Sequence, residues 1–371
     1  MRYLSALIPY DPDKTIEYSK EDAGYHIYDN ILRKKYDIMS HIYRTDKIVK
    51  NSYRKMVIIS HPFEIIHRYV TSSFIPDFPK MKMTNAYMKM WEFLEWADKE
   101  NYLHVPKSKL TMFDIAAAPG MFIIATENYL RINYPNTKLD WQACSLEGGT
   151  ALTDTYDLFK NNPDRYRPCD VLNKSDIENC MSTGKYYLVT GDIGIYHEDN
   201  YDKLQEEVQL DIEWGQMILS INLVEKGGIM FLKMYSLVTL ESIYLLDTLH
   251  KYFEYVFITK PYCTRIFNDE CYIICINRND KDCSSEPFSR PPISNYKSPN
   301  IDIVRSFEYA RLELKYRMVN FIKLIFEHGG HELTVESFKN NNTYKIYFDE
   351  FSKLFNTFEK FDFIKIWNLN E

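Results

Sequence analysis

The sequence contains no long apolar run, since no stretch approaches 18 consecutive apolar residues, and we expect no transmembrane helix. The apolar patch in Met1–Pro9 is too short for the core of a signal peptide. The seven cysteines are an odd number and form no C-x-x-C pair, so a disulfide framework or a zinc site is the weaker interpretation. Cys271 and Cys275 fit one face of a strand as small apolar residues. We therefore expect a soluble, cytoplasmic protein of a reducing compartment, with no metal and no membrane association.

Glycine and positive charge are also scarce. There are 12 glycines against 30 tyrosines and 22 phenylalanines, which indicates a compact, aromatic protein. Lysine and arginine total 45 and aspartate and glutamate 52, giving a net charge of −7 that excludes a uniformly basic nucleic-acid binder. With 371 residues, 45% of them hydrophobic, the chain can bury a large core as one domain with extensions or as two domains.

Strand-like and helix-like segments alternate between residues 111 and 277. This alternation predicts βαβ crossovers and a mostly parallel sheet covered by helices on both faces. The expected strands are residues 110–116, 138–144, 186–190, 229–232, 255–259 and 271–276. The expected helices are residues 121–132, 202–225, where Gly227-Gly228 ends the helix, and 237–252. Polar, proline-bearing residues 278–300 suit a linker, and residues 302–328 and 351–361 repeat apolar side chains at helical spacing.

The most informative string is DIAAAPGMF, residues 114–122, between the first of these strands and its helix. Small residues after a buried strand let the backbone approach a ligand, and the start of the helix offers free N–H groups. The string is neither a dinucleotide fingerprint nor a P-loop. A simple tight turn remains the alternative.

This string resembles the D-x-G-A-A-P-G-G-F motif of FtsJ-like RNA ribose 2′-O-methyltransferases, with Ala116 and Met121 in place of two glycines. Other segments follow in the family's order. Residues 85–94 resemble the family's lysine-bearing helix, and residues 185–192 resemble its strand ending in Ser-Asp. Residues 216–236 resemble its helix, Gly-Gly turn and strand ending in Lys. Residues 260–272 resemble the K-P-x-x-S-R-x-x-S-x-E-x-Y stretch. The resemblance spans about residues 80–278.

The resemblance implies a catalytic tetrad of Lys89, Asp192, Lys233 and Glu270. A ribose 2′-hydroxyl is a poor nucleophile, so its attack on a sulfonium methyl needs a nearby base. A lysine serves only if its pKa falls, which burial, a second lysine and the sulfonium all favour. We expect Lys233 to be this base, Asp192 and Lys89 to position it and the methyl group, and Glu270 to hold the lysines. Taken singly, each residue also suits an ordinary surface or turn position.

The cofactor implied by the resemblance is S-adenosylmethionine. The family commonly has an acidic residue where Ser145 stands in this sequence. We expect Glu147, or an ordered water, to contact the ribose hydroxyls in its place. Asp170 matches an acidic position that contacts the adenine amine, and a simple loop aspartate is the alternative. The expected cofactor contacts are Asp114, Ala116, Ala117, Ala118, Pro119, Gly120, Phe122, Glu147, Asp170 and Asp192.

Residues 31–56 carry eight basic and two acidic side chains, with tyrosines interleaved at 36, 43 and 53. Attraction of phosphates plus stacking of bases on tyrosine is one interpretation, and a solvated amphipathic helix is the other. The candidate RNA-binding residues are Arg33, Lys34, Lys35, Arg44, Lys47, Lys50, Arg54 and Lys55.

Together these features predict an α/β protein with a Rossmann-like methyltransferase core and a mostly parallel, seven-stranded sheet. We expect an N-terminal extension over residues 1–78, the core over 79–280, a linker over 281–300, and a helical extension over 301–371. The long extensions resemble enzymes that methylate the first transcribed nucleotides of capped mRNA, working with RNA and with other capping or transcription proteins. Ribosomal or transfer RNA as substrate, or a catalytically silent RNA-binding subunit, are the alternatives. The Lys-, Ile-, Asn- and Tyr-rich composition suits an AT-rich genome such as that of a large cytoplasmic DNA virus.

Overall fold

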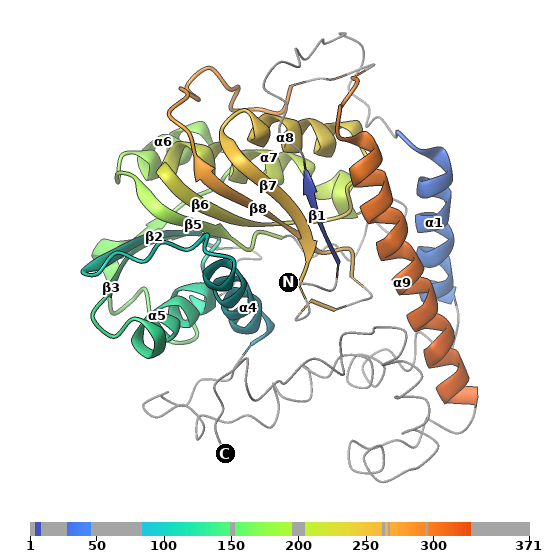
Figure 1. Cartoon of the computed structure of the whole chain (residues 1–371), viewed down its shortest axis with the longest axis horizontal. Helices are drawn as coiled ribbons and strands as arrows, with labels where there is room; N and C mark the ends of the chain where they lie inside the picture. Colours follow the sequence, from blue (N-terminus) through green and yellow to red (C-terminus); the bar gives the residue numbers. More distant parts are fainter. Residues whose placement is uncertain are drawn as a thin grey trace.

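The structure is a computed structural model, and it describes residues 4–8, 28–45, 84–148, 153–194, 205–261, 264–265, 268–291, 293 and 296–327. Within these residues one sheet of eight strands forms, in the order β1-β7-β8-β6-β5-β2-β3-β4 (Figure 1). The pairs β2–β3, β2–β5, β3–β4 and β5–β6 are parallel, and β1–β7, β6–β8 and β7–β8 are antiparallel. The strands are β1 (Leu4–Ile8), β2 (Lys109–Ile115), β3 (Lys138–Ser145), β4 (Tyr166–Pro168), β5 (Tyr186–Gly191), β6 (Val224–Met234), β7 (Phe253–Lys260) and β8 (Cys271–Arg278).

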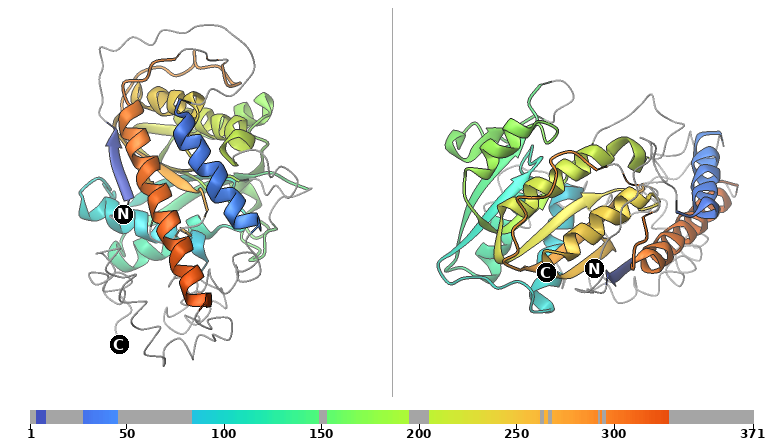
Figure 2. Two further views of the ribbon diagram at one scale, coloured as in Figure 1. Left: turned by 90° about the vertical axis from the view of Figure 1, so that its right-hand side faces the viewer. Right: turned by 90° about the horizontal axis from the view of Figure 1, so that it is seen from above.

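Helices cover both faces of the sheet and bury two separate apolar cores (Figures 1 and 2). One face carries α4 (Asn85–Lys99) and α5 (Met121–Asn133), and the other carries α6 (Lys174–Met181), α7 (Gln205–Leu223) and α8 (Leu240–His250). Cys271, Ile273 and Cys275 alternate along β8 and enter the core under α7 and α8, as their period of two requires. The predicted mostly parallel sheet with helices on both faces is therefore confirmed, and its seven strands β2 to β8 are joined at one edge by an eighth, β1.

Two helices outside this sandwich lie side by side beyond the β1 edge of the sheet, namely α1 (Asn30–Thr45) and α9 (Ile301–Glu327) (Figure 2). The segment that precedes α9 packs on the main body, because Asn300 Nδ2 donates to Asp247 Oδ1 of α8 at 2.5 Å and Tyr296 also donates to Asp247. The apolar repeat at residues 351–361 lies outside the described residues. None of the helices that the structure describes is long and apolar enough to cross a bilayer.

Three features of the sheet differ from the sequence-based expectation. Strand β1 adds an eighth strand, antiparallel to β7, from a segment that carries no strong strand signal of its own. The short strand β4 and the helix α6 were not expected. Gly227-Gly228 does not end a helix, because α7 already stops at Leu223 and the glycines lie inside β6. Gly227 has φ +79°, and a Cβ on Gly228 would come within 2.7 Å of the Tyr187 carbonyl oxygen, so glycine is needed where β6 bends against β5.

Candidate active site

The polar residues of the predicted tetrad meet at one edge of the sheet for a topological reason. Asp192 follows directly after β5 and Lys233 lies near the end of the parallel strand β6. Strand β8 runs antiparallel to β6, so its beginning, preceded by Glu270, reaches the edge where the parallel strands end. Lys89 comes from the second turn of α4, whose start is capped by the Thr84 hydroxyl accepting from the Tyr87 N–H at 3.2 Å. Four distant segments thus deliver their side chains to one place.

Lys89 lies between the two carboxylates. Its Nζ is 2.6 Å from Glu270 Oε1 and 3.4 Å from Asp192 Oδ1. Lys89 and Glu270 are buried, while Asp192 is half-buried and closer to the outside. An amine held by two carboxylates in this way is fixed in position, which suits a residue that orients others.

Lys233 contacts the same carboxylate oxygen of Asp192 as Lys89 does. Its Nζ is 3.1 Å from Asp192 Oδ1 and donates to the Asp192 carbonyl oxygen at 2.8 Å. Gly194 leaves room for this side chain, because a Cβ there would lie 3.0 Å from Lys233 Nζ. Asp192 therefore bridges the two lysines, and the structure brings all four predicted tetrad residues together.

Tyr272 is a fifth member of this cluster that the sequence analysis did not single out. Its hydroxyl accepts from Lys89 Nζ at 2.6 Å and lies 2.6 Å from Asp192 Oδ1 and 2.9 Å from Glu270 Oε1, to either of which it can donate. Tyr272 also pairs with Lys233 across β6 and β8. The signal was present in the sequence, because positions 270 and 272 of an E-x-Y string on a strand share one face.

The charges in the cluster shift the pKa values in opposite directions. Burial acts to raise the pKa of Glu270, but the ammonium groups of Lys89 and Lys233 outweigh it and the pKa is lowered. Burial acts to lower the pKa of Lys233, but Asp192, Tyr235 and Glu270 outweigh it, and the pKa is raised. The expectation that the pKa of Lys233 falls is therefore wrong for the free protein. Burial in a site with two carboxylates stabilises its charged form.

A pocket opens next to the cluster, where the order of the sheet reverses between β2 and β5. It encloses about 240 Å³, with Asp192 in the wall toward the tetrad and Asp170 among its other lining residues. The lining residues are Ile115, Ala116, Ala118, Cys144, Ser145, Leu146, Cys169, Asp170, Val171, Leu172, Asp192, Ile193, Gly194 and Ile212. Mostly apolar walls with a few carboxylates suit a nucleoside attached to a charged group.

The predicted cofactor loop forms one wall of this pocket. Ala116 has φ +56°, a left-handed conformation in which the family's glycine is unstrained, and it lines the pocket together with Ala118. The Ala118 N–H donates to the Ser145 hydroxyl at 2.9 Å. Ser145 therefore ties the loop to the end of β3, a role that its sequence position did not reveal.

Other predicted cofactor residues stand behind the pocket wall. The buried Asp114 accepts a hydrogen bond from the Thr190 hydroxyl at 2.7 Å, and burial raises its pKa to about 8. Gly120 has φ +96° and packs so closely that a Cβ would lie 2.3 Å from Leu158. Phe122 stacks on Phe231 in the core. The predicted contacts that do not line this pocket are Asp114, Ala117, Pro119, Gly120, Phe122 and Glu147.

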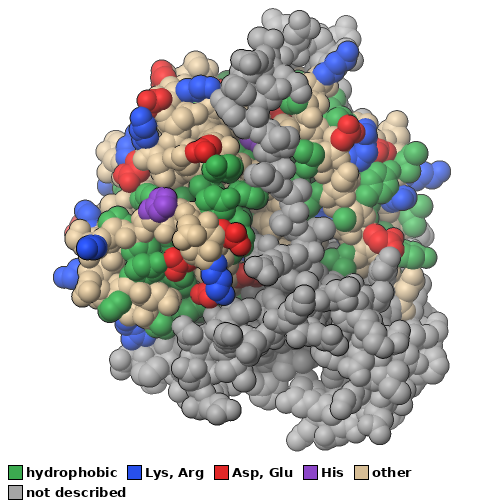
Figure 3. Space-filling view, in the orientation of Figure 1, with side chains coloured by type: hydrophobic (Ala, Val, Ile, Leu, Met, Phe, Trp, Pro, Cys, Tyr) green, Lys and Arg blue, Asp and Glu red, His purple; other side chains and the backbone are tan. Residues whose placement is uncertain are grey.

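Four of the predicted RNA-binding residues, Arg33, Lys34, Lys35 and Arg44, lie on α1, and none of the first three lines this pocket. Arg33 donates to Glu207 at 2.8 Å, while Lys34 and Lys35 are exposed and Lys35 Nζ lies 4.6 Å from the centre of the Tyr309 ring. Basic and apolar side chains share this edge of the molecule (Figure 3). Tyr36 is not available for stacking, because it is buried and hydrogen-bonded to Glu308. The side chain of Arg44, and Lys47, Lys50, Arg54 and Lys55, lie outside the described residues.

Comparisons with known proteins find methyltransferases. A family model for FtsJ-like methyltransferases matches residues 85–278, from the start of α4 to the end of β8. A probable methyltransferase of African swine fever virus is 32% identical over 219 residues, covering 53% of this chain and 49% of the relative. A cap-specific mRNA (nucleoside-2′-O-)-methyltransferase 2 of Drosophila melanogaster is 28% identical, covering 53% and 30% of the two chains. A cap-specific mRNA (nucleoside-2′-O-)-methyltransferase of Autographa californica nuclear polyhedrosis virus is 24% identical, covering 64% and 86%. The match thus spans about half the length of the first of these relatives.

Proposed function

This chain belongs to the FtsJ-like methyltransferase family, and we propose that it methylates the ribose 2′-hydroxyl of RNA at the first transcribed nucleotides of capped mRNA. The observation that carries the proposal is the position of Asp192. This residue lines the pocket and also contacts both lysines of the tetrad. A cofactor and an acceptor hydroxyl can therefore meet at one carboxylate. The names of the fly and baculovirus relatives support capped mRNA as the substrate.

The pocket fits S-adenosylmethionine, the cofactor of this family, by its chemistry. Ile115, Leu172 and Ile193 offer apolar surface to an adenine ring, and Asp170 offers an acceptor for its amine. The pocket is slightly smaller than the roughly 300 Å³ at which ligand sites begin. Asp170 and these apolar residues would hold the adenosine part, and Asp192 would contact the positively charged part. When bound, the cofactor supplies an electrophilic methyl group on a positively charged sulfur.

The residues of the tetrad then have separate tasks. In the free site the two ammonium groups balance the two carboxylates. A further cation bound beside Asp192 would favour loss of a proton to solvent from Lys233, whose pKa the carboxylates raise in the free protein. Lys89 is held by Glu270 and Tyr272 as well, which leaves Lys233 as the lysine that serves the acceptor hydroxyl. The neutral Lys233 amine accepts the proton of the 2′-hydroxyl as its oxygen attacks. Lys89, Glu270 and Tyr272 keep Asp192 and Lys233 in place, and this alignment supplies part of the acceleration.

The decisive experiment is transfer of a labelled methyl group from S-adenosylmethionine to RNA. Two transcripts of the same sequence, one capped and one uncapped, are incubated with the protein, and nuclease digestion maps the modified nucleotide. We expect a labelled first or second nucleotide in the capped transcript alone. Equal labelling of both transcripts, or labelling only of ribosomal or transfer RNA, would reject the cap substrate. Binding of the cofactor without any transfer would identify a catalytically silent subunit.

A further inference from the structure

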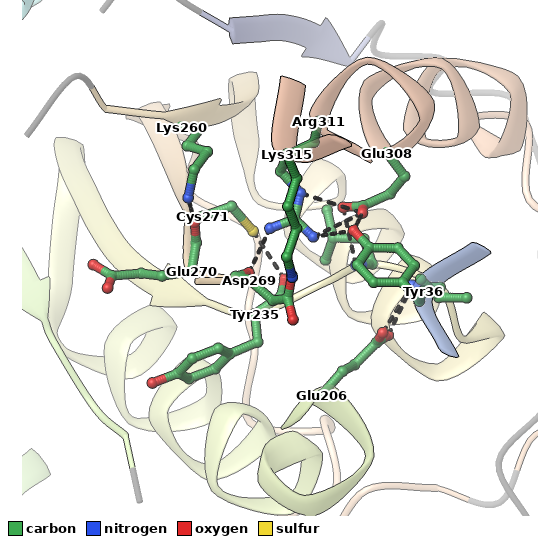
Figure 4. A network of polar contacts seen from close by, with 12 residues as sticks. Tyr36, Glu206, Tyr235, Lys260, Asp269, Glu270, Cys271, Glu308, Arg311 and Lys315 are labelled. Atoms are coloured by element: carbon green, nitrogen blue, oxygen red, sulfur yellow. Dashed lines mark hydrogen bonds and ion pairs between the residues drawn. The ribbon is translucent and has the colours of Figure 1, made fainter. Parts of the chain in front are cut away.

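Helix α9 lies outside the region that the family model matches, yet two of its side chains reach the segment just before β8. Arg311 Nη1 donates to the Asp269 carbonyl oxygen at 2.5 Å, and Lys315 Nζ is 2.9 Å from Asp269 Oδ1. Asp269 directly precedes Glu270. Figure 4 shows both α9 side chains converging on Asp269, while the Glu270 side chain points away from α9.

The backbone carbonyls of this segment accept hydrogen bonds from buried basic side chains. Lys260 Nζ donates to the carbonyl oxygens of Asn268 at 3.1 Å and Glu270 at 2.8 Å, and Arg311 donates to that of Asp269, between them. Three consecutive carbonyls, just before the first paired residue of β8, Cys271, thus each accept a hydrogen bond from a basic side chain. Asn268 Nδ2 in turn donates to Glu270 Oε2 at 2.8 Å. The Glu270 side chain is therefore oriented by a segment that has no sheet partner of its own.

Arg311 has three hydrogen-bond partners, namely the Asp269 carbonyl oxygen, Glu308 and Tyr36. It is buried, and its Nη2 donates to Glu308 Oε2 at 2.8 Å and to the Tyr36 hydroxyl. Glu308 also accepts from the Leu237 N–H at 3.1 Å, just after β6. The anchor of Glu270 thus extends through α9 to α1 and back to the main body (Figure 4).

We propose that Arg311 and Lys315 are positioning residues, which fix Asp269 and thereby hold Glu270 against Lys89. This inference rests on the proposed function, since it assumes that the tetrad performs methyl transfer. It predicts that α9 belongs to the catalytic unit, although no α9 side chain touches the tetrad among the contacts described above.

The test variant is Lys315→Met, which keeps the length of the side chain and removes the charge. We expect kcat to fall about 10-fold, because small misplacements of catalytic groups have effects of this order, while the Kd for S-adenosylmethionine stays within twofold. Lys315→Arg restores the ion pair with Asp269 and should recover most of kcat. The matched control is Arg305→Met on the same helix, whose ion pairs are with Asp29 and Asp302, and it should leave kcat unchanged.

Hydrogen exchange gives a readout that does not depend on activity. In Lys315→Met, the amides of residues 268–272 should exchange at least about 10-fold faster, with no change in α4 or β5. If the wild type labels no RNA, the proposed function fails, and the exchange result still tests the anchor. Wild-type kcat and wild-type exchange in Lys315→Met would overturn the positioning role, and so would a fall in kcat that Lys315→Arg does not recover.

A second, independent observation concerns three cysteines on the other side of the pocket. Cys144 lies one residue before the end of β3, Cys169 follows β4 and Cys180 lies on α6, and all three are buried and form no disulfide. Their sulfur atoms lie within 4.8 Å of one another. Three sulfurs bound to one zinc ion at about 2.3 Å lie somewhat under 4 Å apart, so little movement would be needed.

We infer that these thiols form a site for a soft divalent cation, Zn²⁺, whose occupation competes with the cofactor. Cys144 and Cys169 line the pocket, so an ion held by these thiols would lie beside the space expected to hold adenine. Zinc binds the thiolate forms, so its binding releases to solvent the protons that the three side chains still carry. The ion and the cofactor then exclude each other.

Cys180 does not line the pocket, so Cys180→Ser separates the two sites. Equilibrium dialysis should show one Zn²⁺ per wild-type chain and at least about 10-fold weaker binding by Cys180→Ser, with Cys283→Ser as the matched buried control that binds like the wild type. Zn²⁺ should weaken S-adenosylmethionine binding by the wild type, a chelator should reverse this, and Cys180→Ser should be insensitive. Equal zinc binding by both proteins, or bound zinc without an effect on cofactor affinity, would overturn the inference.

Discussion

The region matched by the family model and the α1–α9 pair use basic side chains in opposite ways. In the matched region, Lys89 and Lys233 are buried beside carboxylates at the end of a pocket, where they can act on a ligand. In the α1–α9 pair, Arg33 and Arg311 form ion pairs with Glu207 and Glu308, and neither arginine lines the pocket. A basic residue in a sequence therefore indicates function only when the carboxylates around it are known. The following changes test this contrast.

The largest effect is expected in the tetrad. Lys233→Ala removes the amine that accepts the hydroxyl proton, and general-base catalysis of this kind contributes about 10³-fold. We expect kcat on capped RNA to fall by about that factor, while the Kd for S-adenosylmethionine changes only a few-fold. Single-turnover methyl transfer and calorimetric titration check the two quantities. Transfer at the wild-type rate would remove Lys233 from the mechanism.

Asp114 tests whether a predicted cofactor residue is instead part of the core. Its pKa is raised by burial from 3.8 to about 8, so in the interval between these values the folded state binds a proton that the unfolded state lacks. Its contribution to stability is full below pH 3.8 and is lost as the pH rises through about 8. Binding of this one proton by the folded state alone lowers the free energy of unfolding by about 3 kcal/mol as the pH rises from 5 to 7.

The isosteric variant Asp114→Asn cannot ionise and should lack this component of the pH dependence. Urea unfolding at pH 5, 6 and 7 measures it, with the wild type as reference. Identical slopes against pH in the two proteins would show that Asp114 is charged in the folded state. A large loss of cofactor affinity in Asp114→Asn would return the residue to the binding site.

Tyr272 should have a smaller effect than Lys233. Tyr272→Phe removes a hydroxyl that contacts Lys89, Asp192 and Glu270 but keeps the ring stacked on Phe231. A hydrogen bond to a charged group contributes about 1.5 kcal/mol, which corresponds to about 10-fold in kcat. Tyr244→Phe, a ring in the core away from the tetrad, is the control. Steady-state kinetics of both variants test this prediction. Equal losses of kcat in Tyr272→Phe and Tyr244→Phe would show that the Tyr272 hydroxyl has only a structural role.

The smallest effect is expected on α1. Lys34 is exposed, so Lys34→Glu should weaken RNA binding only a few-fold and reduce the salt dependence of log K by about one phosphate contact. Binding measured by fluorescence anisotropy at several salt concentrations tests this, with Lys226→Glu on an exposed residue of β6 as the control. An unchanged salt slope would identify α1 as a structural helix, which is the alternative that its amphipathic pattern left open.

Much of the central fold could be predicted from the sequence, because its information is local. The buried apolar run at residues 186–190 predicts β5 to within one residue. The helical repeat that begins at residue 302 predicts the start of α9 to within one residue. The four tetrad positions followed from short motifs in the right order. Strand β1 could not be predicted, because five residues form a strand only when an edge such as β7 is free to pair with them. The prediction that Gly227-Gly228 ends a helix was wrong for the same reason, since these glycines are needed where β6 approaches the neighbouring strand β5.

The sequence by itself determined the family, the order of strands and helices from α4 to β8 apart from β4 and α6, and the four residues proposed as the tetrad, since these depend on patterns within about ten residues. Only the tertiary structure decided which charges face one another. It raised the pKa of Lys233 where a fall was expected, added Tyr272 to the tetrad, and buried Tyr36 beneath α9. It also connected Arg311 and Lys315 to the Glu270 segment, more than 40 positions away. Electrostatic energies depend on distance and burial in space, and a linear sequence specifies neither until the chain has folded.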